Sequence, residues 1–353
     1  MSATMKALVK PKPAPGFLLT DVPVPAVGPG DVLIAVEKAG LCGTDHHIYA
    51  WDGWAQQRIK PPIVVGHEFM GTVAAIGSEV RSIRAGERVS AEGHIADLTC
   101  LLCRTGQAHI CEHVEIIGVD RDGAFAQYVA IPENNVWRLD ADIPDVSAAI
   151  FDPLGNAVHT VMAAGVSVKS VVVSGVGSIG LLAVAVARAA GATSIYAIDV
   201  NPARLELART LGADAGFLSS DPGIADEIRR RTAGNGADVL LEMSGNAAAI
   251  DLGLRVLRNG ATAALLGLPS RPVTLDLADR IIFKGITVLG INGRRMFETW
   301  YQAEALVKSG RVDPRTVITH VLPYTAFDEA FALMEKGEAV KIVLDFKGDI
   351  AKP

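Results

Sequence analysis

Aromatic residues and positive charge are both scarce in this chain of 353 residues. Phe, Tyr and Trp together make up 5% of the sequence, whereas hydrophobic residues make up 50% and glycine occupies 35 positions. The 33 Lys and Arg residues are outnumbered by 39 Asp and Glu residues, so the formal net charge at pH 7 is -6. Because positive charge is not in excess, we expect no nucleic-acid partner. The hydrophobic content excludes a disordered chain, and the length favours two domains.

Cysteine is also rare, and the sequence contains only Cys42, Cys100, Cys103 and Cys111. A chain of this length needs no disulfides to build a core. The N-terminal residues contain no apolar stretch of signal-peptide length, so we expect a cytoplasmic protein with reduced thiols. The grouping of three cysteines between residues 100 and 111 indicates a metal site instead.

One stretch without charge, between Lys169 and Arg188, is long enough to raise the question of a membrane span. It contains three glycines and three serines, and it begins like a strand and ends like a helix. This pattern favours a soluble strand–loop–helix unit, so we expect no membrane partner.

The pattern of secondary structure changes at about residue 150. Before it, short strand-like runs lie between Gly and Pro residues. After it, strands alternate with helices as far as about residue 295, which is typical of a doubly wound parallel sheet. We therefore predict an α/β protein with a Rossmann domain at residues 158–295. A β-rich domain is formed by residues 1–157 and 296–353.

Residues 175–180 have the sequence G-x-G-x-x-G after a predicted strand and before a predicted helix. Gly175 allows a tight turn, Gly177 lets the backbone approach a pyrophosphate, and Gly180 lets the helix pack closely on the strand. Asp199 ends the next strand, where a carboxylate accepts hydrogen bonds from ribose hydroxyls and repels a 2′-phosphate. This favours NAD over NADP. Arg204 either moderates that preference or flanks the adenine, and the alternative for the whole motif is a glycine-rich turn without a ligand.

Cys42 and His67 are candidate ligands of a catalytic zinc ion. Such a site has few protein ligands and leaves one position open for water or substrate. A carboxylate would complete the set, and we expect Glu68, Asp152 or both in exchange. The alternative is an unmetallated Cys–His pair.

Two further residues can carry the proton that an alcohol loses when it is oxidised at a zinc site. The hydroxyl of Thr44 can accept this proton. His47 can pass it to solvent, because histidine is the residue type suited to proton transfer near neutral pH.

A second metal site is predicted where an aspartate and three cysteines occur at the spacing of a closed structural zinc lobe. Its candidate ligands are Asp97, Cys100, Cys103 and Cys111. Asp97 stands where a fourth thiolate is expected and has the same formal charge. The alternative is a loop of reduced thiols without metal, because a hard oxygen ligand weakens such a site.

Several motifs together resemble the medium-chain dehydrogenase/reductase superfamily. Residues 66–89 contain GHE-x-x-G-x-V and GERV, which are similar to its zinc alcohol dehydrogenase signature. Within the superfamily, the chain is most similar to the bacterial L-threonine 3-dehydrogenases over essentially its whole length. The matching segments are CGTDHHIYAWDGWAQ from Cys42, AEGHI from Ala91, IFDPLGNAVHT from Ile150, LEMSG from Leu241 and GRRMFETWY from Gly293.

This resemblance implies a GroES-like catalytic domain that binds zinc, and NAD-dependent oxidation of L-threonine to 2-amino-3-ketobutyrate by a homotetramer. It implies zinc ligation by Cys42, His67 and Glu68, a proton relay through Thr44 and His47, and a role for His94 in substrate preference. It places cofactor contacts at Ile179, Asp199, Arg204, Leu266, Gly267, Leu268, Ile291 and Asn292.

The residues predict the reaction type more narrowly than the substrate. Selecting an amino acid requires partners for an ammonium and a carboxylate group, and Arg294 is a candidate beside His94. A polyol, a butanediol or another secondary alcohol is the alternative substrate for the same mechanism. A non-catalytic NAD-binding protein is the alternative of another class, but such a protein would be expected to have lost Cys42, His67 or Thr44.

Three positions depart from the pattern of these relatives. Asp97 replaces the first cysteine of the structural zinc quartet. Asn292 stands where the bacterial enzymes usually have an aromatic residue, and Asp152 stands where some wider relatives have Glu.

Overall fold

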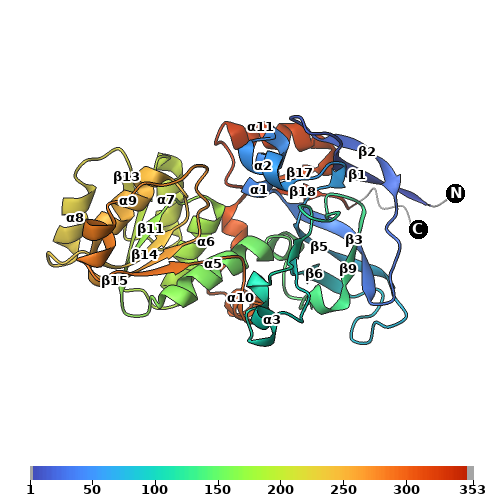
Figure 1. Ribbon diagram of the computed structural model, residues 1–353, viewed down its shortest axis with the longest axis horizontal. Helices are drawn as coiled ribbons and strands as arrows, with labels where there is room; N and C mark the ends of the chain where they lie inside the picture. Colours follow the sequence, from blue (N-terminus) through green and yellow to red (C-terminus); the bar gives the residue numbers. More distant parts are fainter. Residues whose placement is uncertain (1–2, 348–353) are drawn as a thin grey trace. The chain divides into compact units, whose positions relative to one another are not determined.

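The computed structural model describes residues 3–347 and contains two compact units (Figure 1). The first unit combines the chain up to Asp152 with the segment from Pro314 onward, and the second unit is Pro153–Asp313. These units overlap the two predicted domains, whose exact limits stay a prediction. Within residues 3–347, no helix has both the length and the apolar character that crossing a membrane requires.

The second unit is built on a six-stranded parallel sheet with the strand order β13-β12-β11-β14-β15-β16. The predicted doubly wound parallel sheet is therefore confirmed. Its strands are β11 (Ser170–Ser174), β12 (Ser194–Asp199), β13 (Ala215–Leu218), β14 (Ala237–Glu242), β15 (Leu257–Leu265) and β16 (Thr287–Gly290). Helix α5 (Phe151–Ala164) begins at the end of the first unit and continues into the second. The other helices of the second unit are α6 (Ser178–Ala189), α7 (Pro202–Thr210), α8 (Ile224–Arg231), α9 (Ala247–Val256) and α10 (Glu298–Lys308).

Local sequence explains where these elements begin. The central strand β11 is a run of valines that are completely buried, as expected for a strand covered on both faces. Helix α7 begins after Asn201, whose side chain accepts the backbone N–H groups of Ala203 and Arg204. Asn201 is therefore the N-cap of α7, and Pro202 stands in the first turn, where no N–H group is required.

The first unit contains a three-stranded sheet, β2-β1-β4, and a seven-stranded sheet. The larger sheet has the order β10-β6-β5-β3-β18-β17, and β9 also pairs with β3. The strands are β1 (Thr4–Lys10), β2 (Leu18–Pro23), β3 (Asp31–Gly40), β4 (Ile63–Val64), β5 (Glu68–Ile76), β6 (Arg88–Ala91), β9 (Tyr128–Pro132), β10 (Val136–Arg138), β17 (Ile318–Pro323) and β18 (Lys341–Asp345). A small hairpin joins β7 (His94–Ile95) and β8 (Glu115–Ile116), and the helices are α1 (Gly43–Ala50), α2 (Gly53–Arg58), α3 (Leu101–Arg104), α4 (Asp145–Ala148) and α11 (Phe327–Glu335).

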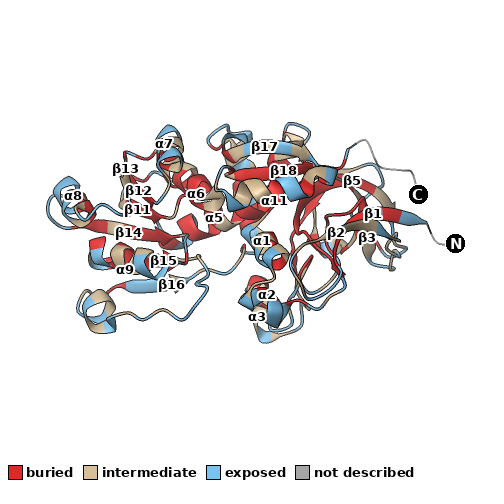
Figure 2. Cartoon of the chain, turned by 90° about the horizontal axis from the view of Figure 1, so that it is seen from above, coloured by how far each residue is buried: buried red, intermediate tan, exposed pale blue. Residues whose placement is uncertain are grey.

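The order of strands in the larger sheet brings distant parts of the chain together. Strand β3 pairs antiparallel with β5, with Gly40 opposite Glu68. The C-terminal strand β18 pairs with the other edge of β3, with Val343 opposite Gly40. Figure 2 shows β5 and β18 in the colour of buried residues, whereas β16 in the second unit is largely exposed. The end of β3 and the starts of β5 and β18 therefore meet inside the first unit.

Candidate active site

Three predicted zinc ligands converge at this meeting point. One donor atom from each of Cys42, His67 and Glu68 lies within 4.8 Å of the other two. Cys42 follows β3 and precedes the first turn of α1, and Glu68 begins β5. Strands β3 and β5 are paired with Gly40 opposite Glu68. This register brings the sulfur of Cys42, a nitrogen of His67 and an oxygen of Glu68 around one point.

A lysine that the sequence analysis missed neutralises the carboxylate of this group. The Nζ atom of Lys341 lies 2.5 Å from Glu68 Oε2, and the two side chains are 2% and 0% exposed. The same nitrogen donates a hydrogen bond of 2.7 Å to the carbonyl of Leu41. Burial by itself lowers the pKa of Lys341, but attraction to Glu68 and Cys42 outweighs it and raises the pKa. Lys341 is therefore the cation of a buried ion pair.

Asp45 is a second residue that the sequence analysis missed. Its side chain is completely buried, with Oδ2 accepting the backbone N–H of Cys42 at 2.8 Å and Oδ1 lying 3.7 Å from His67 Nδ1. Burial raises the pKa of Asp45 to about 6. Burial also lowers the pKa of His67, but the charges of Asp45 and Cys42 outweigh this and raise it to about 10. The acidic groups around His67 thus favour a cation among the side chains of Cys42, His67 and Glu68.

The donor set and its charges fit a zinc ion. Thiolate, imidazole and carboxylate are zinc ligands, and three protein ligands leave a fourth position open. Glu68 Oε1 is buried and accepts no hydrogen bond from residues 3–347, so it is available as a donor. A divalent cation, together with Lys341, would offset the negative charges of Cys42, Glu68 and Asp45.

The other carboxylate predicted for this site is Asp152, in the first turn of α5. It is buried, and its charge contributes to the raised pKa of His67. It does not belong to the described group of donors within 4.8 Å. The structure thus brings Glu68 into the group of three donors, and any exchange with Asp152 stays a prediction.

Thr44 and His47, the predicted relay residues, lie on α1. The Thr44 Oγ1 atom is 3.8 Å from the Cys42 sulfur, beside the three donors. The His47 side chain is 47% exposed, and its Nδ1 lies 2.6 Å from Asp52 Oδ2. Asp52 uses its other oxygen to accept the N–H groups of Trp54 and Ala55 and so caps α2. The sequence analysis did not single out Asp52.

The glycine-rich turn opens into a cavity of about 470 Å³ in the second unit. Gly175 has a φ of +83°, which L side chains rarely adopt, and a Cβ atom at Gly180 would lie 2.0 Å from the Gly175 carbonyl oxygen. Gly177 precedes α6 without any side-chain cap, so the first N–H groups of this helix are available to an anion. The residues that line the cavity are Ser174, Gly175, Gly177, Ile198, Asp199, Val200, Arg204, Ser219, Met243, Ser244, Asn246, Ala248, Ala249 and Leu252.

Asp199 is held rigidly at the edge of this cavity. Its Oδ2 accepts the backbone N–H of Val176 at 2.7 Å, and its Oδ1 accepts the N–H of Asn201 at 2.9 Å. Each carboxylate oxygen can accept more than one hydrogen bond, so both remain available to ribose hydroxyls. Asp199 thus connects the glycine-rich turn to the start of α7.

Other predicted cofactor contacts do not line this cavity. Ile179 and Gly180 lie in the first turn of α6. Leu266, Gly267 and Leu268 follow β15, and Ile291 and Asn292 follow β16. Their contacts with a dinucleotide stay predictions. The sequence analysis missed the loop after β14, where Met243, Ser244 and Asn246 line the cavity.

The two predicted substrate residues occupy buried positions. His94 is 9% exposed, and its backbone N–H donates to Glu92 Oε1 at 2.9 Å. Arg294 is 3% exposed, and its side-chain carbons pack so closely on α5 that a Cβ atom at Gly155 would lie 2.8 Å from them. Contact of either residue with a substrate stays a prediction.

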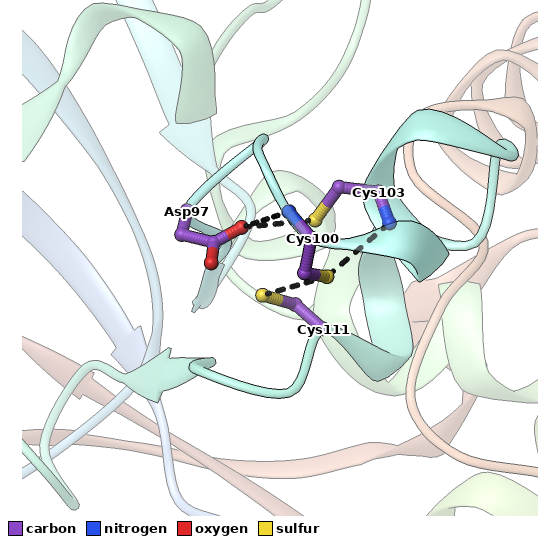
Figure 3. Close-up of side chains that lie close together, drawn as sticks. All are labelled: Asp97, Cys100, Cys103 and Cys111. Carbon is purple, nitrogen blue, oxygen red and sulfur yellow. Dashed lines mark hydrogen bonds between the residues drawn. The ribbon is translucent and has the colours of Figure 1, made fainter.

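The predicted metal lobe also converges in space (Figure 3). The donor atoms of its four candidate ligands, Asp97, Cys100, Cys103 and Cys111, lie within 4.8 Å of one another. The Cys100 and Cys111 sulfurs are 3.8 Å apart, and the Cys103 sulfur is 3.5 Å from Asp97 Oδ1. Hydrogen bonds from the backbone N–H of Thr99 and from the His113 side chain hold the pKa of Asp97 below its usual range. The lobe therefore presents one carboxylate and three sulfurs to a single point, as a zinc ion requires.

Comparisons with known proteins agree with this geometry. Residues 28–141 match the alcohol dehydrogenase GroES-like domain, and residues 178–309 match the zinc-binding dehydrogenase family. The L-threonine 3-dehydrogenase of Symbiobacterium thermophilum is 48% identical over 345 residues, which is 98% of each chain. That of Bacillus subtilis is 47% identical over 343 residues, which is 97% of this chain and 99% of the relative.

Solved structures show the same similarity. An alcohol dehydrogenase from Thermus sp. ATN1 has a TM-score of 0.89 at 30% identity, covering 97% of this chain and 99% of that one. A zinc-binding dehydrogenase from Sinorhizobium meliloti, bound to NADP, has a TM-score of 0.89 at 28% identity, covering 98% of this chain and all of that one.

Proposed function

This chain belongs to the zinc-binding dehydrogenase family, and on that premise we propose that it oxidises the secondary alcohol of L-threonine to 2-amino-3-ketobutyrate, with hydride transfer to NAD. The 48% identity with an L-threonine 3-dehydrogenase over nearly the full length carries this proposal. The convergence of Cys42, His67 and Glu68 supports it, because a catalytic zinc site uses three such protein ligands and leaves a fourth position for the substrate.

The residues of the first unit divide the chemistry between them. Cys42, His67 and Glu68 would hold a zinc ion, which would supply Lewis-acid chemistry that lowers the pKa of an alcohol. The Thr44 hydroxyl lies beside the donor group, so it can accept the substrate proton while it releases its own proton towards His47. His47 delivers the proton to solvent, since nearly half of its side chain is exposed.

The second unit binds the cofactor. The anion-binding end of α6 receives the pyrophosphate, and Asp199 binds the ribose hydroxyls of NAD. The fixed position of the Asp199 carboxylate opposes a 2′-phosphate and so favours NAD over NADP. Arg204 also lines the cavity and either moderates this preference or flanks the adenine.

We assign a second, structural zinc ion to the lobe of Asp97, Cys100, Cys103 and Cys111. Four donors converge there, which is the number that a closed structural site uses. A zinc ion at this site would crosslink α3, the loop that contains Asp97, and Cys111. It would stabilise residues 97–111, which have few buried side chains.

We further propose that the chain acts in the cytoplasm as a homotetramer. Self-association is supported by β16, which ends the sheet of the second unit and is largely exposed. The nearby Ile282 and Phe283 side chains are 68% and 77% exposed. A free sheet edge beside large apolar side chains is typical of a surface that a second chain covers.

The function is tested by measuring NAD reduction with L-threonine beside a panel of polyols and diols, before and after chelation and zinc repletion. We expect L-threonine to be oxidised faster than the polyols and diols. Chelation should abolish this activity and zinc should restore it, and NAD should be reduced faster than NADP. Zinc-dependent activity on a butanediol or polyol alone would replace the substrate and keep the mechanism. Inactivity towards the whole panel would favour first an alcohol outside the panel and then a non-catalytic NAD-binding protein.

The proton relay gives a prediction at Asp52, which orients His47. The Asp52→Ser substitution keeps an N-cap for α2, because serine is a good capping residue, but its shorter side chain loses the contact with His47. We expect kcat to fall by about tenfold, a part of the roughly 10²–10⁴-fold contribution of a general base, with little change in KM. The pH profile of kcat should also change.

The matched control uses His47→Asn, which should itself slow turnover and alter the pH profile. Adding Asp52→Ser to His47→Asn should cause no further loss, because the two residues act through one contact. If kcat of the double variant were a further tenfold below that of His47→Asn, Asp52 would affect turnover by a route other than its contact with His47.

A further inference from the structure

The carboxylate in the metal lobe differs from a thiolate because it has two oxygens that can ligate. In this structure the two oxygens have separate surroundings. Oδ1 of Asp97 lies 3.5 Å from the Cys103 sulfur and accepts the backbone N–H groups of Thr99 and Cys100 at 2.8 and 3.1 Å. Figure 3 shows this oxygen directed at the cysteines. Oδ2 lies 2.6 Å from Nδ1 of His113.

We propose that His113 is a positioning residue of the metal lobe, which binds Oδ2 of Asp97 so that Oδ1 serves as the fourth metal ligand. The proposal rests on the lobe zinc assigned above. A carboxylate that is free to rotate can exchange its oxygens or ligate through both, and each alternative perturbs a tetrahedral site with three thiolates. The backbone N–H groups of Thr99 and Cys100 restrain Oδ1, and the His113 bond to Oδ2 completes this restraint, as outer partners of metal ligands generally do. A cysteine at position 97 would need no such partner.

The exposure of the two side chains separates this role from simple stabilisation. His113 is 70% exposed and Asp97 is 24% exposed. An ion pair in such an exposed position contributes little to folding, because solvent screens the attraction between its charges. Its effect on metal binding is expected to be larger, because loss of an outer partner typically weakens metal affinity by about 10- to 100-fold. The backbone N–H of His113 also lies 3.3 Å from the Cys111 sulfur, so a side-chain substitution leaves that contact in place.

The test measures metal affinity of the full chain by chelator competition, with Zn²⁺ for the dissociation constant and Co²⁺ as a spectroscopic probe. Cobalt–thiolate absorption distinguishes the lobe, with three sulfurs, from the active site, with one. We expect His113→Ala to weaken metal binding in the lobe by about 10- to 100-fold and to leave the active-site metal unchanged. His113→Asn, whose amide can still donate to Oδ2, should recover most of the affinity. His320→Ala, on β17, is the matched control and should have no effect.

The decisive comparison repeats His113→Ala in a chain that also has Asp97→Cys. A thiolate ligates through one atom. In the Asp97→Cys chain, His113→Ala should therefore leave the metal affinity of the lobe unchanged. An equal loss of affinity in both backgrounds, or no loss in either, would overturn the proposal. A wild-type chain that shows only the one-sulfur cobalt site would overturn both the lobe zinc and the role of His113. Turnover of L-threonine in that chain would still leave the dehydrogenase function in place.

Discussion

Replacing Cys42 with serine should lower threonine-dependent NAD reduction by about 1000-fold or more. The serine hydroxyl is neutral at pH 7 and is a much poorer zinc ligand than a thiolate, so the Lewis acid would be lost from the active site. Stabilisation by a metal ion contributes several kcal/mol at the transition state, and each ~1.4 kcal/mol corresponds to a factor of ten in rate. The measurement is kcat with L-threonine, together with the zinc content of the chain.

Binding of NAD by the Cys42→Ser variant is the internal control. The cavity that contains Asp199 lies wholly within the second unit, whereas Cys42 belongs to the first. We therefore expect the dissociation constant for NAD, measured by calorimetry, to stay within about twofold of the wild-type value, and the lobe to keep its zinc. A collapse of NAD affinity would contradict the assignment of cofactor and metal to separate units.

The second large effect is expected at Lys341, where a methionine should lower the free energy of unfolding by about 3–5 kcal/mol. The substitution leaves the buried Glu68 carboxylate without its cation while two other acidic groups, Cys42 and Asp45, remain nearby. Denaturant unfolding of the zinc-replete enzyme measures the loss. Chelation should increase it, because the zinc ion is the other positive charge that offsets Glu68.

A double variant shows whether this loss comes from the ion pair. Glu68→Gln combined with Lys341→Met removes both charges, so it should be more stable than Lys341→Met alone. Lys336→Met, at an exposed lysine, is the matched control and should change stability by no more than about 0.5 kcal/mol. If the two substitutions at the ion pair were simply additive, Lys341 and Glu68 would not be coupled.

Several properties could be predicted from the sequence because they depend on residues that are close together in the chain. The spacing of glycines in residues 175–180, between a run of valines and an Ala-rich helix, predicts a dinucleotide-binding turn from local backbone geometry alone. The same holds for the Asn201 cap and for the doubly wound alternation of strands and helices. The residue types of Cys42 and His67, and the close spacing of the lobe cysteines, similarly indicate zinc chemistry before any fold is known.

Only the tertiary structure could decide which distant residues complete these groups. The pairing of β3 with β5 on one side and β18 on the other brings Lys341 to Glu68, and no local pattern marks a lysine near the C-terminus as its partner. The grouping of Glu68 with Cys42 and His67, and the pairing of His113 with Asp97 in the lobe, are likewise visible only in the tertiary structure. Periodicity and spacing report on neighbouring residues, whereas strand order and register determine which charges must be buried together.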